Sequence, residues 1–220
     1  MTDTTISKPL RVLLADDHAA IRLGMRMVVE TAPDMEVIGE AGDGALTVSM
    51  TRTLRPDVVL MDLRMPVMDG VEATEIICSE ELAKVLVLTT FDHDSYLFGA
   101  LQAGASGFLL KSAEPFAITD ALRRVHVGDQ VIAPEVTARI VSAALANGSG
   151  PVVSPTPPAG LDLLTDREKE VFECLGSGLT NYGIGRQLGI SEATVKTHVS
   201  RVLAKLGLRT RVQAALFQRI

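Results

Sequence analysis

The sequence has 220 residues, 47% of them apolar, and a formal net charge of -6. This length fits two modest domains with real hydrophobic cores. No apolar run approaches the roughly 18 residues of a membrane-spanning helix, so we expect no such helix. The first residues, MTDTTISKP, lack the basic start and apolar core of a signal peptide, so we expect a cytoplasmic protein.

Strands and helices alternate through the first half of the chain. Short apolar runs predict strands at residues 10–17, 35–40, 58–62, 84–90 and 106–111. Apolar residues at helical spacing predict helices at residues 19–30, 43–54, 71–81, 95–103 and 115–127. Strands separated by such helices form right-handed crossovers and one parallel sheet. We therefore expect an α/β fold over residues 8–128, with a five-stranded doubly wound parallel sheet.

Residues 129–160 have the character of a linker. A helical stretch, EVTARIVSAALA, is followed by NGSGPVVSPTPPAG, which has four prolines and three glycines in 14 residues and no apolar periodicity. This composition predicts an extended, mobile segment, with an ordered surface loop as the alternative.

Residues 161–220 predict a small all-helical unit. Thr165 with Glu168 three residues later forms a capping-box pattern, a second helix begins at Thr180, and Ser191 caps a third helix, EATVKTHVSRVLAKL. Two helices across a short Gly turn, the second with a polar and basic outer face, predict a helix-turn-helix; an ordinary helical hairpin remains the alternative. From Gly176 onward seven basic residues accompany one acidic residue, which favours nucleic-acid binding, although a solvated basic surface would give the same count.

Carboxylates gather at one edge of the predicted sheet. Strands one and three are neighbours in the order 2-1-3-4-5, so Asp16, Asp17 and Asp62 would share one crevice. Close carboxylates repel unless a cation is present, and Mg²⁺ suits oxygen donors and phosphoryl groups. Asp62 could then attack phosphorus, with the cation of Lys111 and the hydroxyl of Thr89 facing the product. Alone, Asp62 could equally be a turn residue or a helix cap.

This pattern resembles the receiver domain of bacterial two-component response regulators. It comprises two early aspartates, DLRMP..DG, a hydroxyl after VLVL and the lysine of GFLLK. The resemblance implies a flavodoxin-like fold and a protein that regulates rather than an enzyme, with Asp62 as the phosphoacceptor of a sensor histidine kinase. It further implies the following roles: Mg²⁺ ligation by Asp17, Asp62 and the backbone carbonyl of Arg64, with Asp16 acting through water, and switching by Thr89, Phe108 and Lys111. Ser112 replaces a common proline, and Phe108 has no hydroxyl.

The second half is similar to the LuxR-type helix-turn-helix of NarL/FixJ-type response regulators, through LTDRE.EV and ISEATVKTHVSRVLAKLGLRTRVQAA. The resemblance implies binding of double-stranded promoter DNA by a homodimer that forms on phosphorylation. Its base-reading positions match Lys196, Thr197 and Ser200, and phosphate contacts match His198 and Arg201. The segment at about 210–219 matches the helix that pairs two such domains.

Two other classes of function remain open. Phosphatases that form an aspartyl phosphate also place a nucleophilic Asp at a strand end, but they usually carry a second Asp where this chain has Arg64. A receiver that dimerises without phosphorylation is the second alternative, although unused buried carboxylates would be costly. His18 and His93, near the acidic edge, are interpreted as loop and helix-start residues rather than metal ligands.

Two glycines depart from the LuxR-type pattern. Gly183 and Gly185 stand where the family usually has Glu and Ala. Because a glycine inside a helix costs about 1 kcal/mol relative to alanine, Gly185→Ala should stabilise the second domain by roughly that amount.

Overall fold

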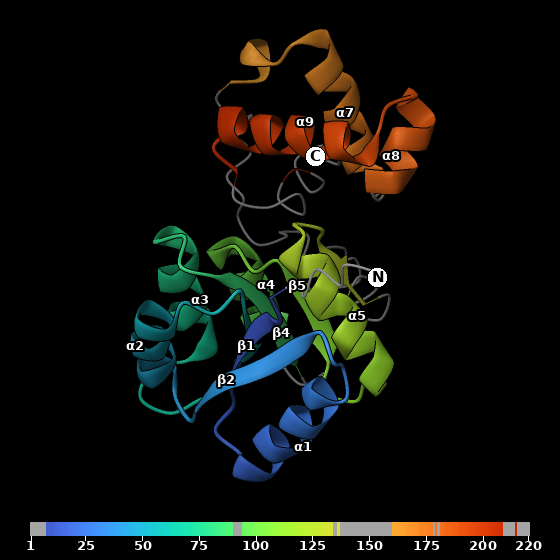
Figure 1. Ribbon diagram of the computed structural model, residues 1–220. Helices are drawn as coiled ribbons and strands as arrows, with labels where there is room; N and C mark the ends of the chain where they lie inside the picture. The colour runs from blue at the N-terminus through green and yellow to red at the C-terminus, as the bar shows by residue number, and fades with distance from the viewer. Residues whose placement is uncertain are drawn as a thin grey trace, which may run out of the picture.

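The computed structural model describes residues 8–89, 94–133, 136, 160–177, 179, 181–208 and 214, and the statements below concern these residues. An α/β unit is followed by a separate helical unit (Figure 1). Within the described part of the chain, no helix is long and apolar enough to cross a bilayer.

The sheet of the first unit is parallel throughout, in the order β2-β1-β3-β4-β5-β6. Its strands are β1 (Leu10–Ala15), β2 (Met35–Ala41), β3 (Val58–Asp62), β4 (Lys84–Thr89), β5 (Gly107–Leu110) and β6 (Val131–Ile132). Every residue of β3 is buried, as expected for a central strand covered on both faces. The predicted α/β class and the order of the first five strands are confirmed.

The expectation of five strands is wrong by one. The short strand β6 pairs with β5 through Gly107 and Phe108 and extends the sheet beyond residue 128. Two residues carry no detectable periodicity, so the sequence pattern assigned them to the linker. The remainder of that predicted linker, and the predicted last helix at about 210–219, lie almost wholly outside the described residues.

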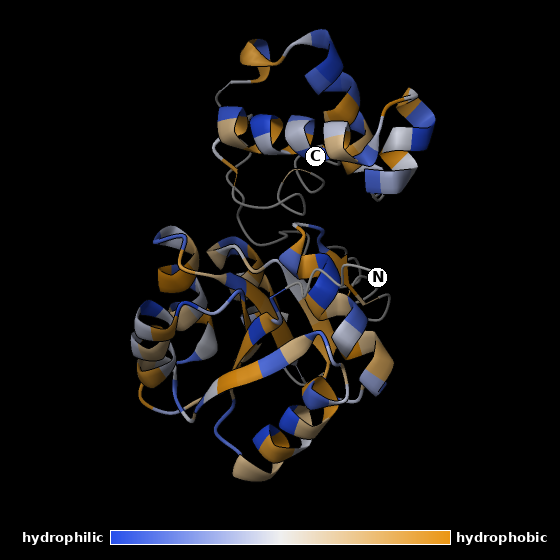
Figure 2. Ribbon diagram, viewed as in Figure 1, coloured by the Kyte–Doolittle hydropathy of each residue, from blue (hydrophilic) through white to orange (hydrophobic). Residues whose placement is uncertain are grey.

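Helices cover both faces of the sheet. Its two faces are covered by α1 (Ala19–Glu30) with α5 (Pro115–His126), and by α2 (Gly44–Leu54), α3 (Gly70–Ser79) and α4 (Asp94–Ala103). Hydrophobic and hydrophilic stretches alternate along these helices (Figure 2), because only one side of each contacts the core. The sheet is therefore fixed between two layers of helices, and its carboxyl edge carries the candidate site.

The loop after β3 is held close to the strand that precedes it. Asp69 caps α3 by accepting from the backbone N–H groups of Val71 and Glu72. A Cβ on Gly70 would lie only 2.0 Å from the carbonyl oxygen of Asp62, so only glycine fits beside this strand end. Gly70 also donates its N–H to the carbonyl of Leu63. The glycine of the DG pair thus fixes the chain next to Asp62.

The helical unit contains a short 3₁₀ turn, η1 (Leu161–Leu163), and the helices α7 (Asp166–Gly176), α8 (Asn181–Leu188) and α9 (Glu192–Leu206). Thr165 and Glu168 form the predicted capping box, and Ser191 caps α9 through the N–H of Thr194. The turn between α8 and α9 passes through Gly189 at a φ of 67°. Val195, Val202 and Leu206 of α9 are buried in the core of this unit.

Gly185 does not occupy open space. A Cβ at this position would lie 2.8 Å from the carbonyl oxygen of Ile190, and the Ile190 N–H donates to the carbonyl of Gly185 over 3.0 Å. The turn thus folds tightly against α8 at the glycine. The structure argues against the gain expected from Gly185→Ala, because the turn would have to shift.

Candidate phosphorylation site and nucleic-acid interface

Two buried carboxylates meet at the carboxyl edge of the sheet. Asp16 follows the last residue of β1 and Asp62 ends β3, and these strands pair directly, with Ala15 opposite Met61. Each aspartate is only 6% exposed. Asp17 follows in the loop with its side chain about one-third exposed. The structure therefore places Asp16 and Asp62 side by side, at the point where strand order reverses. Among the described residues, the ligand atoms grouped with Asp17 are those of Asp16 and His18, and Asp62 is not part of that group.

Lys111 closes the site from the end of β5. Its Nζ lies 2.6 Å from Oδ2 of Asp16 and 3.0 Å from Oδ2 of Asp62. The backbone N–H of Lys111 donates to the carbonyl of Thr89 over 2.9 Å, so the ends of β4 and β5 hold the lysine over the carboxylates. One cation thus bridges two buried anions.

Burial raises the pKa of the Asp62 carboxyl above its ordinary value, because the charged form loses hydration. The ion pair with Lys111 offsets part of this rise, whereas the negative charge of Asp16 adds to it. A single lysine shared between two carboxylates leaves net negative charge in the crevice. Additional positive charge would therefore stabilise this arrangement.

The donor set fits a hard divalent cation. Ligand atoms of Asp16, Asp17 and His18 lie within 4.8 Å of one another, and Asp62 shares Lys111 with Asp16. Carboxylate and carbonyl oxygens are the ligands that Mg²⁺ prefers. Arg64, whose carbonyl is the predicted third ligand, lies in the loop directly after β3, with its side chain exposed.

Two of the predicted switch residues, Thr89 and Phe108, occupy different environments. Thr89 ends β4 and is half-buried at the same edge as Lys111. Phe108 is fully buried inside β5, opposite Val87. The aromatic ring therefore lies within the core of the sheet rather than at the acidic edge.

The predicted DNA-reading residues lie on α9. Thr197, Ser200 and Arg201 are exposed and Lys196 is half-buried. Thr197 already bonds the carbonyl of Ala193 through its hydroxyl. Nδ1 of His198 is buried and has no hydrogen-bond partner among the described residues. A phosphate contact by His198 would thus depend on its other ring nitrogen.

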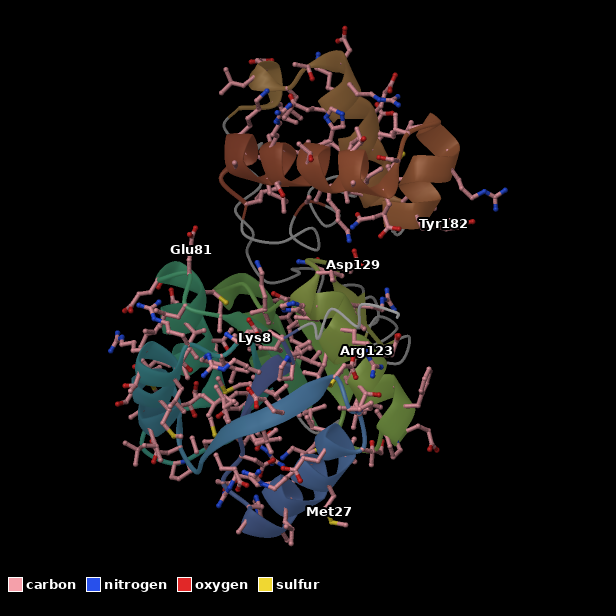
Figure 3. All side chains as sticks on the ribbon, viewed as in Figure 1. Lys8, Met27, Glu81, Arg123, Asp129 and Tyr182 are labelled. Atoms are coloured by element: carbon pink, nitrogen blue, oxygen red, sulfur yellow. The ribbon has the colours of Figure 1, made fainter. Side chains whose placement is uncertain are left out.

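The turn after α5 contacts the helix-turn-helix. Oδ1 of Asp129 accepts a hydrogen bond of 2.8 Å from Nδ2 of Asn181, the first residue of α8, and lies 3.8 Å from Nζ of Lys196. Asp129 stands at the edge of the α/β unit nearest the helices (Figure 3). A cavity of about 210 Å³ beside this contact is lined by Lys196 and Ser200, among others. Two predicted base-reading side chains therefore face the first unit.

Sequence reasoning missed Asp129, Asn181 and the role of His18. No local pattern marks Asp129, because its partners lie 52 and 67 positions further along the chain. His18 was interpreted as a loop or helix-start residue rather than a metal ligand; it does precede α1, but its side chain makes no capping hydrogen bond. Its ring instead contacts Asp17.

Family models match both parts of the chain. Residues 12–123 match the response regulator receiver domain, and residues 162–218 match the bacterial regulatory proteins of the luxR family. Together these matches cover the acidic site and the helix-turn-helix.

Relatives match this chain along nearly their whole length. The chain is 40% identical to the transcriptional regulatory protein LiaR of Bacillus subtilis, over 94% of this chain and 96% of that protein. It is 34% identical to the nitrate/nitrite response regulator protein NarL of Escherichia coli, over 96% and 95%. Among solved structures, the response regulator ChrA of a heme-sensing two-component system aligns with a TM-score of 0.56 and 34% identity, over 97% of this chain and 98% of that one.

Both family models match, the receiver domain first and the luxR family second, and they include the acidic site and the helix-turn-helix. The relatives match the chain along nearly its whole length. The chain belongs to the response regulators, as a two-component transcription regulator with a receiver domain followed by a LuxR-type DNA-binding domain.

Proposed function

We propose that Asp62 is the residue that receives the phosphoryl group from a sensor histidine kinase. The observation that carries this proposal is the placement of a buried carboxylate at the end of β3, with Asp16 and Lys111 beside it. An oxygen of Asp62 bonds to phosphorus as the phosphorus–nitrogen bond of the phosphohistidine breaks. An acyl phosphate forms, and the electron pair of the broken bond stays on the histidine.

Asp17, Asp62 and the carbonyl of Arg64 would hold Mg²⁺, with Asp16 acting through water. The ion supplies positive charge to the phosphoryl oxygens and reduces repulsion between the carboxylates. Lys111 already pairs with Asp62, so after transfer its ammonium group lies near the new phosphoryl charge. Thr89 offers its hydroxyl to the same group from the end of β4. Contacts made only in the phosphorylated state favour a second conformer of β4, α4 and β5.

The output is binding of promoter DNA by a homodimer. Lys196, Thr197 and Ser200 would read bases in the major groove, and His198 and Arg201 would contact phosphates. Two half-sites about 10 bp apart fit a dimer of this motif. A protein that meets both a kinase and promoter DNA in this way works in the cytoplasm.

The contact at Asp129 supports the proposal that the unphosphorylated protein binds DNA weakly. Asn181 begins α8 and Lys196 lies in the first half of α9, and both bind the same carboxylate. Helix N-termini contact DNA phosphates, and Lys196 is a proposed base-reading residue, so a carboxylate held beside both groups would compete with DNA for them. We infer that this contact competes with DNA until phosphorylation changes the receiver.

A DNA-binding titration at fixed salt tests the proposal. Wild type and Asp62→Asn are compared with and without acetyl phosphate plus Mg²⁺, and Asp120→Asn, at a partly exposed position on α5, serves as the control. We expect tighter, dimer-dependent binding only for wild type and the control after phosphorylation. Equal gains for Asp62→Asn would show that another residue accepts the phosphoryl group, and no gain for any variant would remove phosphorylation from the mechanism.

A further inference from the structure

His18 contacts both early aspartates of the site. Its backbone N–H donates to Oδ1 of Asp16 over 2.8 Å, and its ring Nδ1 lies 2.6 Å from Oδ1 of Asp17. The residue precedes α1, but its side chain does not cap the helix. The ring is therefore engaged with the acidic loop and takes no part in starting the helix.

The three carboxylates differ in how they are held. Asp16 receives the N–H of His18 on one oxygen and Lys111 on the other, and Asp62 pairs with Lys111. Among the described residues, the side chain of Asp17 has only the ring of His18 as a partner. Without this ring, the partly exposed carboxylate of Asp17 would be free to rotate into solvent.

We propose that His18 is a positioning residue for the divalent cation of the phosphorylation site. With Nδ1 protonated, the ring donates to one oxygen of Asp17, restricts the rotamers of this side chain and leaves its second oxygen for the cation. This inference rests on the proposed role of Asp17 as a ligand. Groups that orient a ligand in this way commonly change metal affinity by about 10- to 100-fold when they are removed.

The position of the ring argues for orientation rather than for a contribution to stability. The side chain of His18 is 67% exposed, so its removal leaves no cavity in the core. Its contact with Asp17 lies at the surface, where an ion pair contributes little to folding. The expected consequence of its loss is thus confined to the metal site.

Calorimetric titration of the unphosphorylated full-length protein with Mg²⁺ tests this role. We expect His18→Ala to weaken Mg²⁺ binding about tenfold, and His18→Asn, whose amide can donate to Asp17, to recover much of the affinity. His126→Ala, an exposed histidine at the end of α5, is the matched control. Thermal unfolding without Mg²⁺ should be the same for all variants, which separates positioning from folding.

Asp17→Asn separates this inference from the proposed function. If Asp17→Asn binds Mg²⁺ as wild type does, the assignment of the ligands is wrong. If Asp17→Asn loses binding while His18→Ala retains wild-type affinity, the ligand assignment stands and the positioning role is overturned. Tighter binding by His18→Ala would also overturn it, because the ring would then compete with the cation for Asp17.

Discussion

The phosphorylation site and the DNA-reading face are built in different ways. The site collects residues from the ends of β1, β3, β4 and β5, and its geometry follows from the pairing of those strands. The proposed DNA-reading face, formed by Lys196, Thr197, His198, Ser200 and Arg201, lies on one helix, α9, and its geometry follows from that helix alone. In the proposed mechanism, however, its availability depends on the contact of Asp129 with Asn181 and Lys196. A site made by a sheet is fixed by its own domain, whereas a helical face can be covered by another.

Substitution of Lys111 should have the largest effect on stability. It tests how much the shared lysine stabilises the two buried carboxylates at the edge of the sheet. Lys111→Met leaves Asp16 and Asp62 buried together without their shared cation. Removal of one partner from a buried ion pair costs about 3 kcal/mol or more, so we expect a loss of this size in urea unfolding of the receiver.

Mg²⁺ should reduce this loss, since it returns positive charge to the same carboxylates. Unfolding is therefore measured with and without Mg²⁺, and the comparison serves as its own control. A loss of unfolding free energy below about 1 kcal/mol without Mg²⁺ would contradict this prediction. It would mean that Asp16 and Asp62 stay buried without a cation at little cost, although buried charges are expected to be costly.

Gly185→Ala tests the tight packing of the DNA-binding domain. The added Cβ would meet the carbonyl oxygen of Ile190 at 2.8 Å. Overpacking of this kind costs about 1–3 kcal/mol, which outweighs the roughly 1 kcal/mol gained from helix propensity. We expect a net loss of about 1 kcal/mol in this domain, measured by peptide-resolved hydrogen exchange. An increase in protection across α8 and α9 would show that the turn relaxes without cost.

Gly185 illustrates what the sequence could and could not predict. Asp16, Asp62 and Lys111 were placed correctly because parallel strands carry their carboxyl ends to one edge, and Ser191 marked the start of α9 because it is a capping residue. These signals are local or follow from strand periodicity. The approach of the Ile190 carbonyl to Gly185 is set by the path of a turn in three dimensions, which residue types alone do not encode.

The other differences have related causes. The strand β6 was missed because two residues are too short to show a period. The Asp129 contact joins domains on either side of a long linker, so no sequence spacing predicts it. The ring of His18 contacts the preceding loop rather than the helix that follows. The residue types around a helix start do not indicate which of the two the side chain will contact.

Asp129→Asn tests whether the receiver covers the DNA-reading face. The substitution weakens the contact with Lys196 and removes one negative charge beside this proposed base-reading residue. A partly exposed ion pair contributes up to about 1 kcal/mol, so we expect the unphosphorylated protein to bind DNA about three- to fivefold more tightly. The measurement is fluorescence anisotropy at fixed salt.

Asp120→Asn controls for charge in this experiment, because Asp120 is partly exposed on α5 and only weakly paired with Arg124. An equal gain for both variants would assign the effect to net charge. After phosphorylation, wild type and Asp129→Asn should converge. If the two proteins still bound DNA with different affinities after phosphorylation, the Asp129 contact would not be part of the phosphorylation-dependent switch.

Glu168→Gln should have the smallest effect on stability. The Glu168 carboxylate is held by residues of the DNA-binding domain itself. Oε2 of Glu168 accepts from Nζ of Lys205 over 2.6 Å and from the N–H of Thr165 over 2.8 Å. These bonds hold the pKa of Glu168 at about 2, below its ordinary value of 4.5. Its charged form therefore stabilises the fold fully above pH 4.5, and this stabilisation is lost as the pH falls toward 2.

Glutamine keeps the capping hydrogen bond to Thr165, so only the charge that faces Lys205 is removed. We expect protection of α7 and α9 from hydrogen exchange to be slightly lower in Glu168→Gln at pH 7, with the difference from wild type narrowing at pH 3. Glu173→Gln, which alters an exposed carboxylate on the same helix, controls for net charge. A difference that stays constant between the two pH values would mean that the ionised carboxylate contributes nothing beyond its hydrogen bonds, and that the pKa of Glu168 is not depressed by its contact with Lys205.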